Sequence, residues 1–173
     1  RGEGEGRGAT VNLPLQAGRG DQHAWQMLQR SAFPRISAFQ PDVIFVGLGT
    51  DGVEGDPSEA GMRFTPALYA HVVQWCRGAC GRVVCTLQGG YQAGPLAEAV
   101  RQVLRVLAGE GASTPLKAHE GETQESLSEF SRYLDDIEAQ LLDEAKWWSW
   151  EESFAYEPDF EVVPPPLHAT KDE

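Results

Sequence analysis

Two residues occupy the positions where chemistry is most often found in an α/β protein. Asp51 follows the apolar run 41–49 within a glycine-flanked turn, and Tyr91 follows the apolar run 82–88 and two glycines. Ligands of open parallel sheets bind beyond the carboxyl ends of the strands. A carboxylate there could ligate a transition metal, act as a general base or cap a turn. A phenol there could donate a hydrogen bond to an oxyanion or simply cover the end of the sheet. These residues alone leave the alternatives open.

Other groups of reactive residues give weaker signals. Three acids within six residues, Asp51, Glu54 and Asp56, lack the spacing and the terminal glutamate of an EF-hand. The glycine-rich residues 1–10 match a loose dinucleotide-binding fingerprint, but the strand-like run 11–15 follows where that motif requires a helix. The three cysteines (76, 80 and 85) have no second pair and no flanking histidine at metal-site spacing. We therefore interpret them as packing residues, reduced as in an intracellular compartment.

The elements that position these residues alternate between strands and helices. Asp21 is placed to cap a helix that ends at about Phe33, before Pro34. The run 41–49 is typical of a strand buried on both faces of a parallel sheet, and 82–88 predicts a second. Between them, Thr65 and Pro66 predict a helix start. A third helix is expected from Pro95 to near Gly109, with apolar residues Leu96, Val100, Val103, Leu104 and Leu107. This order predicts a parallel α/β sheet flanked by helices.

The charge divides the chain into two parts. The net charge of −12 lies entirely in residues 116–173, which carry 16 acidic and 4 basic residues. This distribution argues against direct binding of nucleic acid. We predict a globular part, 1–115, and an acidic tail, 116–173, whose residues 116–126 look like a linker. Within the tail, Leu127, Phe130, Leu134, Ile137 and Leu141 predict an amphipathic helix near 126–148, followed by an extended, proline-rich end.

Compartment and membrane association can also be addressed from the sequence. No apolar run approaches the roughly 20 residues of a membrane helix. The chain begins with Arg1 and shows no signal-peptide order of charged, apolar and small residues. We expect a fragment or processed chain of a cytoplasmic or nuclear protein, without membrane contact.

Four motifs stand in order within the first 115 residues: GEGEGRGATVNLPL, GRGDQHAW, FQPDVIFVGLGTDGVEGDP and VVCTLQGGY. In this order they resemble the histone deacetylases and acetylpolyamine amidohydrolases, and class II-like members most of all. The resemblance covers the C-terminal part of that family's catalytic domain and none of the tail.

The resemblance implies an arginase-like α/β fold with a catalytic zinc. By the family pattern, Asp51 is a zinc ligand, and Tyr91 hydrogen-bonds the substrate carbonyl and then the tetrahedral oxyanion. Ser58 falls on the rim of the active site, and Asp56 is structural within its own loop. The implied reaction hydrolyses an acetylated protein or polyamine to acetate and a free amine.

Part of the family's machinery is missing from this sequence. Its aspartate-x-histidine zinc ligands and its tandem-histidine general base lie upstream of the matching segment. The triplet 21–23 imitates the ligand motif, but it stands downstream of the glycine loop, and we interpret it as a coincidence. A catalytic zinc needs three protein ligands. We therefore expect this chain alone to be inactive and to need the missing N-terminal part of the domain.

Two hypotheses follow. The chain is part of a zinc-dependent deacetylase, or it is a non-catalytic scaffold derived from one, with the tail helix contacting a protein partner. Because the composition changes near Pro115 and the resemblance ends there, we also predict that cutting the complete enzyme after Pro115 leaves peptide deacetylation nearly unchanged.

Overall fold

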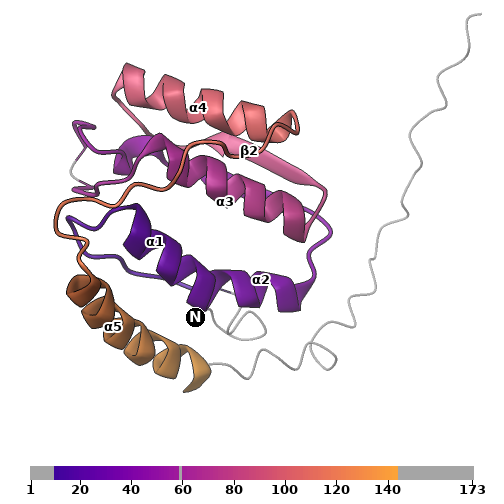
Figure 1. Ribbon diagram of the computed structural model, residues 1–173. Coiled ribbons are helices and arrows are strands. Elements are labelled where there is room, and N and C mark those ends of the chain that lie inside the picture. The colour runs from indigo at the N-terminus through magenta and orange to yellow at the C-terminus, as the bar shows by residue number, and fades with distance from the viewer. Residues whose placement is uncertain (1–9, 59, 144–173) are drawn as a thin grey trace, which may run out of the picture.

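The computed structural model describes residues 10–58 and 60–143 (Figure 1). Its elements confirm the predicted α/β class, with a small parallel sheet flanked by helices. In chain order they are α1 (Asp21–Met27), the π-helical turn η2 (Leu28–Ala32), α2 (Phe33–Phe39), β1 (Ile44–Leu48), the 3-10 turn η3 (Thr50–Gly52), α3 (Pro66–Ala79), β2 (Val83–Leu87), α4 (Ala93–Leu107) and α5 (Gln124–Asp143). The predicted proline-rich end and the last part of the predicted tail helix lie outside the described residues.

The two strands are adjacent and parallel. Ile44 pairs with Val83 at one end and Leu48 with Leu87 at the other. Parallel strands need a crossover connection, and α3 supplies it. Pro66 is the first residue of α3, as predicted, because its fixed φ suits that position. Since both strands run the same way, the loops that carry Asp51 and Tyr91 leave the same edge of the sheet.

The main apolar core lies between the sheet and the helices α3 and α4. Its buried members are Leu48, Ala70, Val73, Val103 and Val106. Helix α4 begins two residues before the predicted Pro95 and ends at Leu107. Its buried residues are Ala99, Val103 and Val106, whereas Leu104, one of the apolar residues named from the sequence, is 58% exposed. Only one face of the helix packs against α3.

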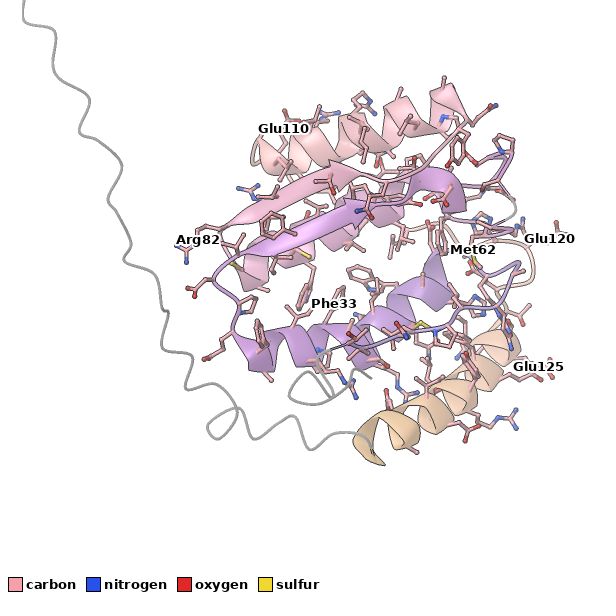
Figure 2. All side chains as sticks on the ribbon, turned by 180° about the vertical axis from the view of Figure 1, so that it is seen from behind. Phe33, Met62, Arg82, Glu110, Glu120 and Glu125 are labelled. Atoms are coloured by element: carbon pink, nitrogen blue, oxygen red, sulfur yellow. The ribbon has the colours of Figure 1, made fainter. Side chains whose placement is uncertain are left out.

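The opposite face of the sheet has no covering layer among the described residues. Phe45 and its partner across the strands, Val84, are 74% and 43% exposed. Figure 2 shows the two strands nearest the viewer, with α3 behind them. The prediction that the strand within 41–49 is buried on both faces is therefore wrong for this part of the protein. The apolar sequence of both strands is that of a two-sided sheet, but only one side is covered here.

The first helical segment continues where a stop was predicted. A π-helical turn separates α1 from α2, and Pro34 lies in the first turn of α2. Proline disrupts a helix interior because it lacks an N–H group, but a first turn has no need of one. The segment packs on α3, where the ring of Phe33 stacks on that of Trp75 at 3.8 Å. The strand predicted for 11–15 is also wrong, because these residues pair with no strand.

Helix α5 packs against α1 (Figure 1). Phe130 and Leu134, both at most 1% exposed, form a second apolar cluster with Met27. Arg30 in η2 donates hydrogen bonds to Asp135 at 2.6 Å and to Glu138 at 2.8 Å. Phe130 and Leu134 of the apolar face predicted for the tail helix thus dock on the globular part, and the side chain of Leu141 lies outside the described residues. The residues before α5 do not behave as a linker, since the ring of His119 is buried.

Candidate active site

The two loops at the carboxyl edge of the sheet interlock through their backbones. Gly89 and Gly90 have φ values of 85° and 98°. A β-carbon at Gly90 would lie 1.8 Å from Oγ1 of Thr50, and one at Gly89 would lie 3.3 Å from Cγ of Asp51. Glycine allows both the left-handed backbone and the close approach. The loop after β2 therefore rests directly on the residues that follow β1.

Asp51 lies in η3, three residues beyond Leu48, the last residue of β1. Its backbone carbonyl accepts a hydrogen bond from Oγ of Ser58 at 2.7 Å. No described residue donates a hydrogen bond to its carboxylate oxygens. A carboxylate of this kind has its lone pairs available to a ligand, and oxygen donors of this type are found in zinc sites. The side chain therefore fits the role of one metal ligand.

Tyr69 supports the same turn from α3. Its hydroxyl donates a hydrogen bond to the carbonyl of Gly49 at 2.9 Å. Burial first, and then the negative charges of Asp51 and two other aspartates, raise the pKa of Tyr69 well above its usual range. The phenol thus stays protonated and remains a donor at every physiological pH.

Asp56 ties the two loops together. Its Oδ2 accepts hydrogen bonds from the backbone N–H groups of Tyr91 and Gln92 at 2.6 and 3.0 Å, and its Oδ1 accepts one from Ser58 at 2.9 Å. Burial acts to raise the pKa of Asp56, but the hydrogen bonds from Tyr91, Ser58 and Gln92 outweigh it and lower that pKa. The prediction that Asp56 bonds within its own loop is incomplete, because two of its contacts reach the other loop.

Tyr91 lies near the end of the segment between β2 and α4, two residues before α4 begins, with 71% of its surface exposed. Its backbone is held on one side by Asp56 and on the other by the contact of Gly90 with Thr50. An exposed phenol on a fixed backbone can donate a hydrogen bond to a bound ligand. The structure thus places Asp51 and Tyr91 in two loops that touch. The metal and catalytic roles assigned to them stay predictions.

The imitation of a ligand motif at 21–23 is a structural cluster. Asp21 is fully buried and accepts hydrogen bonds from the backbone and hydroxyl of Thr65 at 2.8 and 2.6 Å. Nδ1 of His23 lies 2.8 Å from Oε1 of Glu122, and the two side chains are 2% and 4% exposed. Sequence reasoning missed Glu122. The only local hint of a buried contact was that His23 lies four residues before the core residue Met27 and so shares its helix face.

No complete metal site is present in the part of the chain that the structure describes. Within residues 10–58 and 60–143, no three His, Cys, Asp or Glu side chains gather closely enough to hold an ion. Cys76, Cys80 and Cys85 are free thiols, and burial raises the pKa of Cys76 to about 11. None of the helices in this part has the length and apolarity required to cross a bilayer.

Comparison with known proteins decides the family. Residues 1–107 match the histone deacetylase domain. The chain belongs to this family. It is 28% identical over 181 residues to histone deacetylase 15 of Arabidopsis thaliana, covering 86% of this chain and 33% of the relative. It is 38% identical over 113 residues to polyamine deacetylase HDAC10 of Homo sapiens, covering 64% and 17%. The solved structure of the histone deacetylase Clr3 matches with a TM-score of 0.65 at 31% identity, covering 81% of this chain and 23% of that one.

The extent of these matches bears on the domain organisation. This histone deacetylase segment spans a third or less of the relatives it matches. Its matches to histone deacetylase 15 and to Clr3 are longer than the first 115 residues, which make up about two thirds of the chain. The structural likeness therefore extends beyond Pro115. The boundary at residue 115 stays a prediction.

Proposed function

We propose that this chain is the C-terminal part of the catalytic domain of a zinc-dependent deacetylase, which hydrolyses an acetylated protein or polyamine in the cytoplasm or nucleus. The observation that carries the proposal is the contact between the two loops at the carboxyl edge of the sheet. It brings the backbone next to Tyr91 against the carboxylate of Asp51, which accepts no hydrogen bond from a described residue. A metal ligand and an oxyanion donor must surround one carbonyl group in such a reaction.

Within this reaction, each of the two residues has one task. Asp51 would supply a carboxylate ligand to the zinc ion. The phenol of Tyr91 would donate a hydrogen bond to the oxygen of the acetyl carbonyl, and this bond strengthens as negative charge develops there. When bound, zinc supplies polarisation of the carbonyl and lowers the pKa of its water toward about 7. Asp56 and Thr50 hold the two loops so that the two side chains keep their spacing.

The remaining ligands and the general base would come from a part of the protein outside this chain. The uncovered face of the sheet supports this view. Phe45 and Val84 are exposed there on neighbouring strands, and adjoining exposed apolar residues commonly mark an interaction surface. We infer that the rest of the domain covers this face in the complete protein.

The proposal is tested by separating metal binding from catalysis in the complete protein. Tyr91→Phe should lower kcat about 100- to 1,000-fold on an acetyl-lysine peptide or acetylpolyamine, the usual cost of one lost oxyanion donor, and should leave the zinc content intact. Asp51→Ala should lose both zinc and activity. Zinc is measured by atomic emission after dialysis against a weak chelator. Equal loss of zinc in the two variants would show that Tyr91 has been given the wrong role.

Control residues of the same two types lie away from the proposed site. Asp42→Ala removes an exposed carboxylate at the opposite end of β1, paired with Arg82 at 3.2 Å. Tyr133→Phe removes an exposed hydroxyl that bonds to the carbonyl of Pro14. Both variants should keep zinc and turnover. The isolated chain should retain no zinc and show no activity.

A further inference from the structure

A short segment before α5 touches both the helix α1 and the loop that carries Asp51. This segment, residues 117–122, is called the strap below. It lies beyond residues 1–107, the part matched to the histone deacetylase domain. Figure 1 shows it passing from the end of α4 toward α5, and Figure 2 labels Glu120 within it, on the side of the molecule where Met62 precedes α3.

The strap is anchored on α1 by buried polar groups. The backbone N–H of Lys117 donates to Oδ2 of Asp21 at 3.2 Å. The carboxylate of Glu122 lies 2.8 Å from Nδ1 of His23 and accepts the backbone N–H of His119 at 2.8 Å. Breaking such a network leaves buried polar groups unpaired, which destabilises the folded state. The strap is therefore fixed where it crosses α1.

Packing against a glycine fixes the strap further. A β-carbon at Gly20 would lie 2.5 Å from Cδ2 of His119 and 2.9 Å from Oε1 of Glu122. The His119 side chain is 2% exposed, and both of its ring nitrogens lack a hydrogen-bond partner among the described residues. The ring makes no hydrogen bond of its own among the described residues. It is held in place by packing and by the hydrogen bond that its backbone N–H donates to Glu122.

From this anchor the strap reaches the loop of Asp51 through Glu54. Arg63 donates from Nε to Oε1 of Glu54 at 2.9 Å and from Nη1 to the carbonyl of Glu120 at 3.1 Å. Nδ1 of His119 lies 3.7 Å from Oε2 of Glu54. Arg63 therefore bridges the loop and the strap, and His119 approaches the same carboxylate from the strap.

The backbone of the loop belongs to the same assembly. Phe64 donates from its N–H to the carbonyl of Gly52 at 3.1 Å and accepts from the N–H of Glu54 at 2.9 Å. The N–H of Arg63 donates to the carbonyl of Arg19 at 2.9 Å. The residues next to Asp51, the segment before α3 and the residues before α1 are thus joined side by side, with the strap contacting all three.

We propose that the strap positions the loop that carries Asp51, with Glu122, Glu54 and Arg63 as its positioning residues. The inference rests on the proposed function, because it concerns the placement of the proposed zinc ligand. None of the three is assigned a contact with the substrate or the metal in the proposed function; each acts through the loop. The proposal replaces the expectation that a cut after Pro115 is harmless, since that cut removes the strap.

The test compares Glu54→Gln and Glu122→Gln with the control Glu110→Gln in the complete protein. Glu110 also pairs with an arginine, Arg105 at 2.6 Å, but it lies beyond the end of α4 and away from the strap. Amide hydrogen exchange of residues 50–58 is measured in the metal-free protein, and zinc affinity is measured by competition with a chelator. Because Glu122 is buried, Glu122→Gln could unfold the protein; Glu54 is 43% exposed, so Glu54→Gln keeps the test decisive.

Both variants should speed exchange of residues 50–58 and weaken zinc affinity by about tenfold, the low end for groups that orient a metal ligand. kcat should fall with KM unchanged, and Glu110→Gln should change nothing. Unchanged exchange and unchanged zinc affinity in folded Glu54→Gln would overturn the proposal. The exchange measurement needs neither zinc nor activity. Faster exchange in a protein that binds no zinc would therefore support the strap while refuting the proposed function.

Discussion

Two glycines with almost the same φ angle allow the contact between the two loops at the carboxyl edge of the sheet to be tested directly. Gly90 has a φ of 98° and Gly109 a φ of 97°. A β-carbon at Gly90 would lie 1.8 Å from Oγ1 of Thr50, whereas one at Gly109 would meet nothing within 4 Å. Replacement by alanine therefore places a non-glycine residue at positive φ at both sites but creates a clash at only one of them.

The expected magnitudes follow from these two terms. A non-glycine residue in the left-handed region costs about 1–2 kcal/mol, and this should be the whole effect of Gly109→Ala. Gly90→Ala adds the cost of forcing an extra methyl group into a filled space, typically about 1–3 kcal/mol. The protein can relieve the clash by moving the loop after β2 away from Thr50. That movement also carries the neighbouring Tyr91 away, so kcat should fall as well.

The assay is chemical denaturation of the complete protein, together with deacetylation of an acetyl-lysine peptide. Gly90→Ala should be destabilised by more than Gly109→Ala, and only Gly90→Ala should lose turnover. In the double variant Thr50→Ala/Gly90→Ala, part of the stability should return, because the hydroxyl that clashes is gone. If Gly90→Ala and Gly109→Ala lost equal stability and both kept full activity, the two loops would not touch as described.

Two further predictions concern the docking of α5 and the pH dependence of the hydrogen bonds by which Asp56 joins the two loops. Leu134→Ala should lower the free energy of unfolding by about 2–5 kcal/mol, because Leu134 is fully buried against Met27; Leu127→Ala, outside the core of that cluster, should cost clearly less in the same denaturation experiment. Asp56 has a lowered pKa in the folded state, so its stabilising effect is present above the unfolded-state pKa of about 4 and is lost as the pH falls through the folded-state value. The stability advantage of the wild-type protein over Asp56→Asn should therefore be larger at pH 7 than at pH 3, and an advantage that grew on acidification would contradict the assigned hydrogen bonds.

Local patterns in the sequence were enough to find the strands, most of the helices and the loops of interest. A β-branched run bounded by proline and glycine predicted β1, and Thr65 followed by Pro66 predicted the start of α3, because strand formation and the first helical turn depend on neighbouring residues. The order of four motifs identified the family. It also assigned Asp51 and Tyr91 to the site, by analogy and not by physical derivation.

Contacts between distant residues were beyond such patterns. The partner of His23 is Glu122, 99 positions away, and the carboxylate of Asp56 bonds to Tyr91, 35 positions away. Neither residue carries a local sign of its partner, because a hydrogen bond between distant residues depends on where the fold brings the two residues. The same holds for the strap, which looked like a polar linker because its backbone and carboxylate hydrogen bonds leave no apolar periodicity in the sequence.

Sequence by itself thus determined most of the elements that form, the family, and which residues are candidates for chemistry, since propensity, periodicity and motif order are properties of the chain. Only the tertiary structure decided that Pro34 lies within a continuing helical segment, that one face of the sheet is exposed, and that the strap packs beside the loop of Asp51. Each of these depends on the space that other elements fill or leave open. That space exists only once the chain has folded.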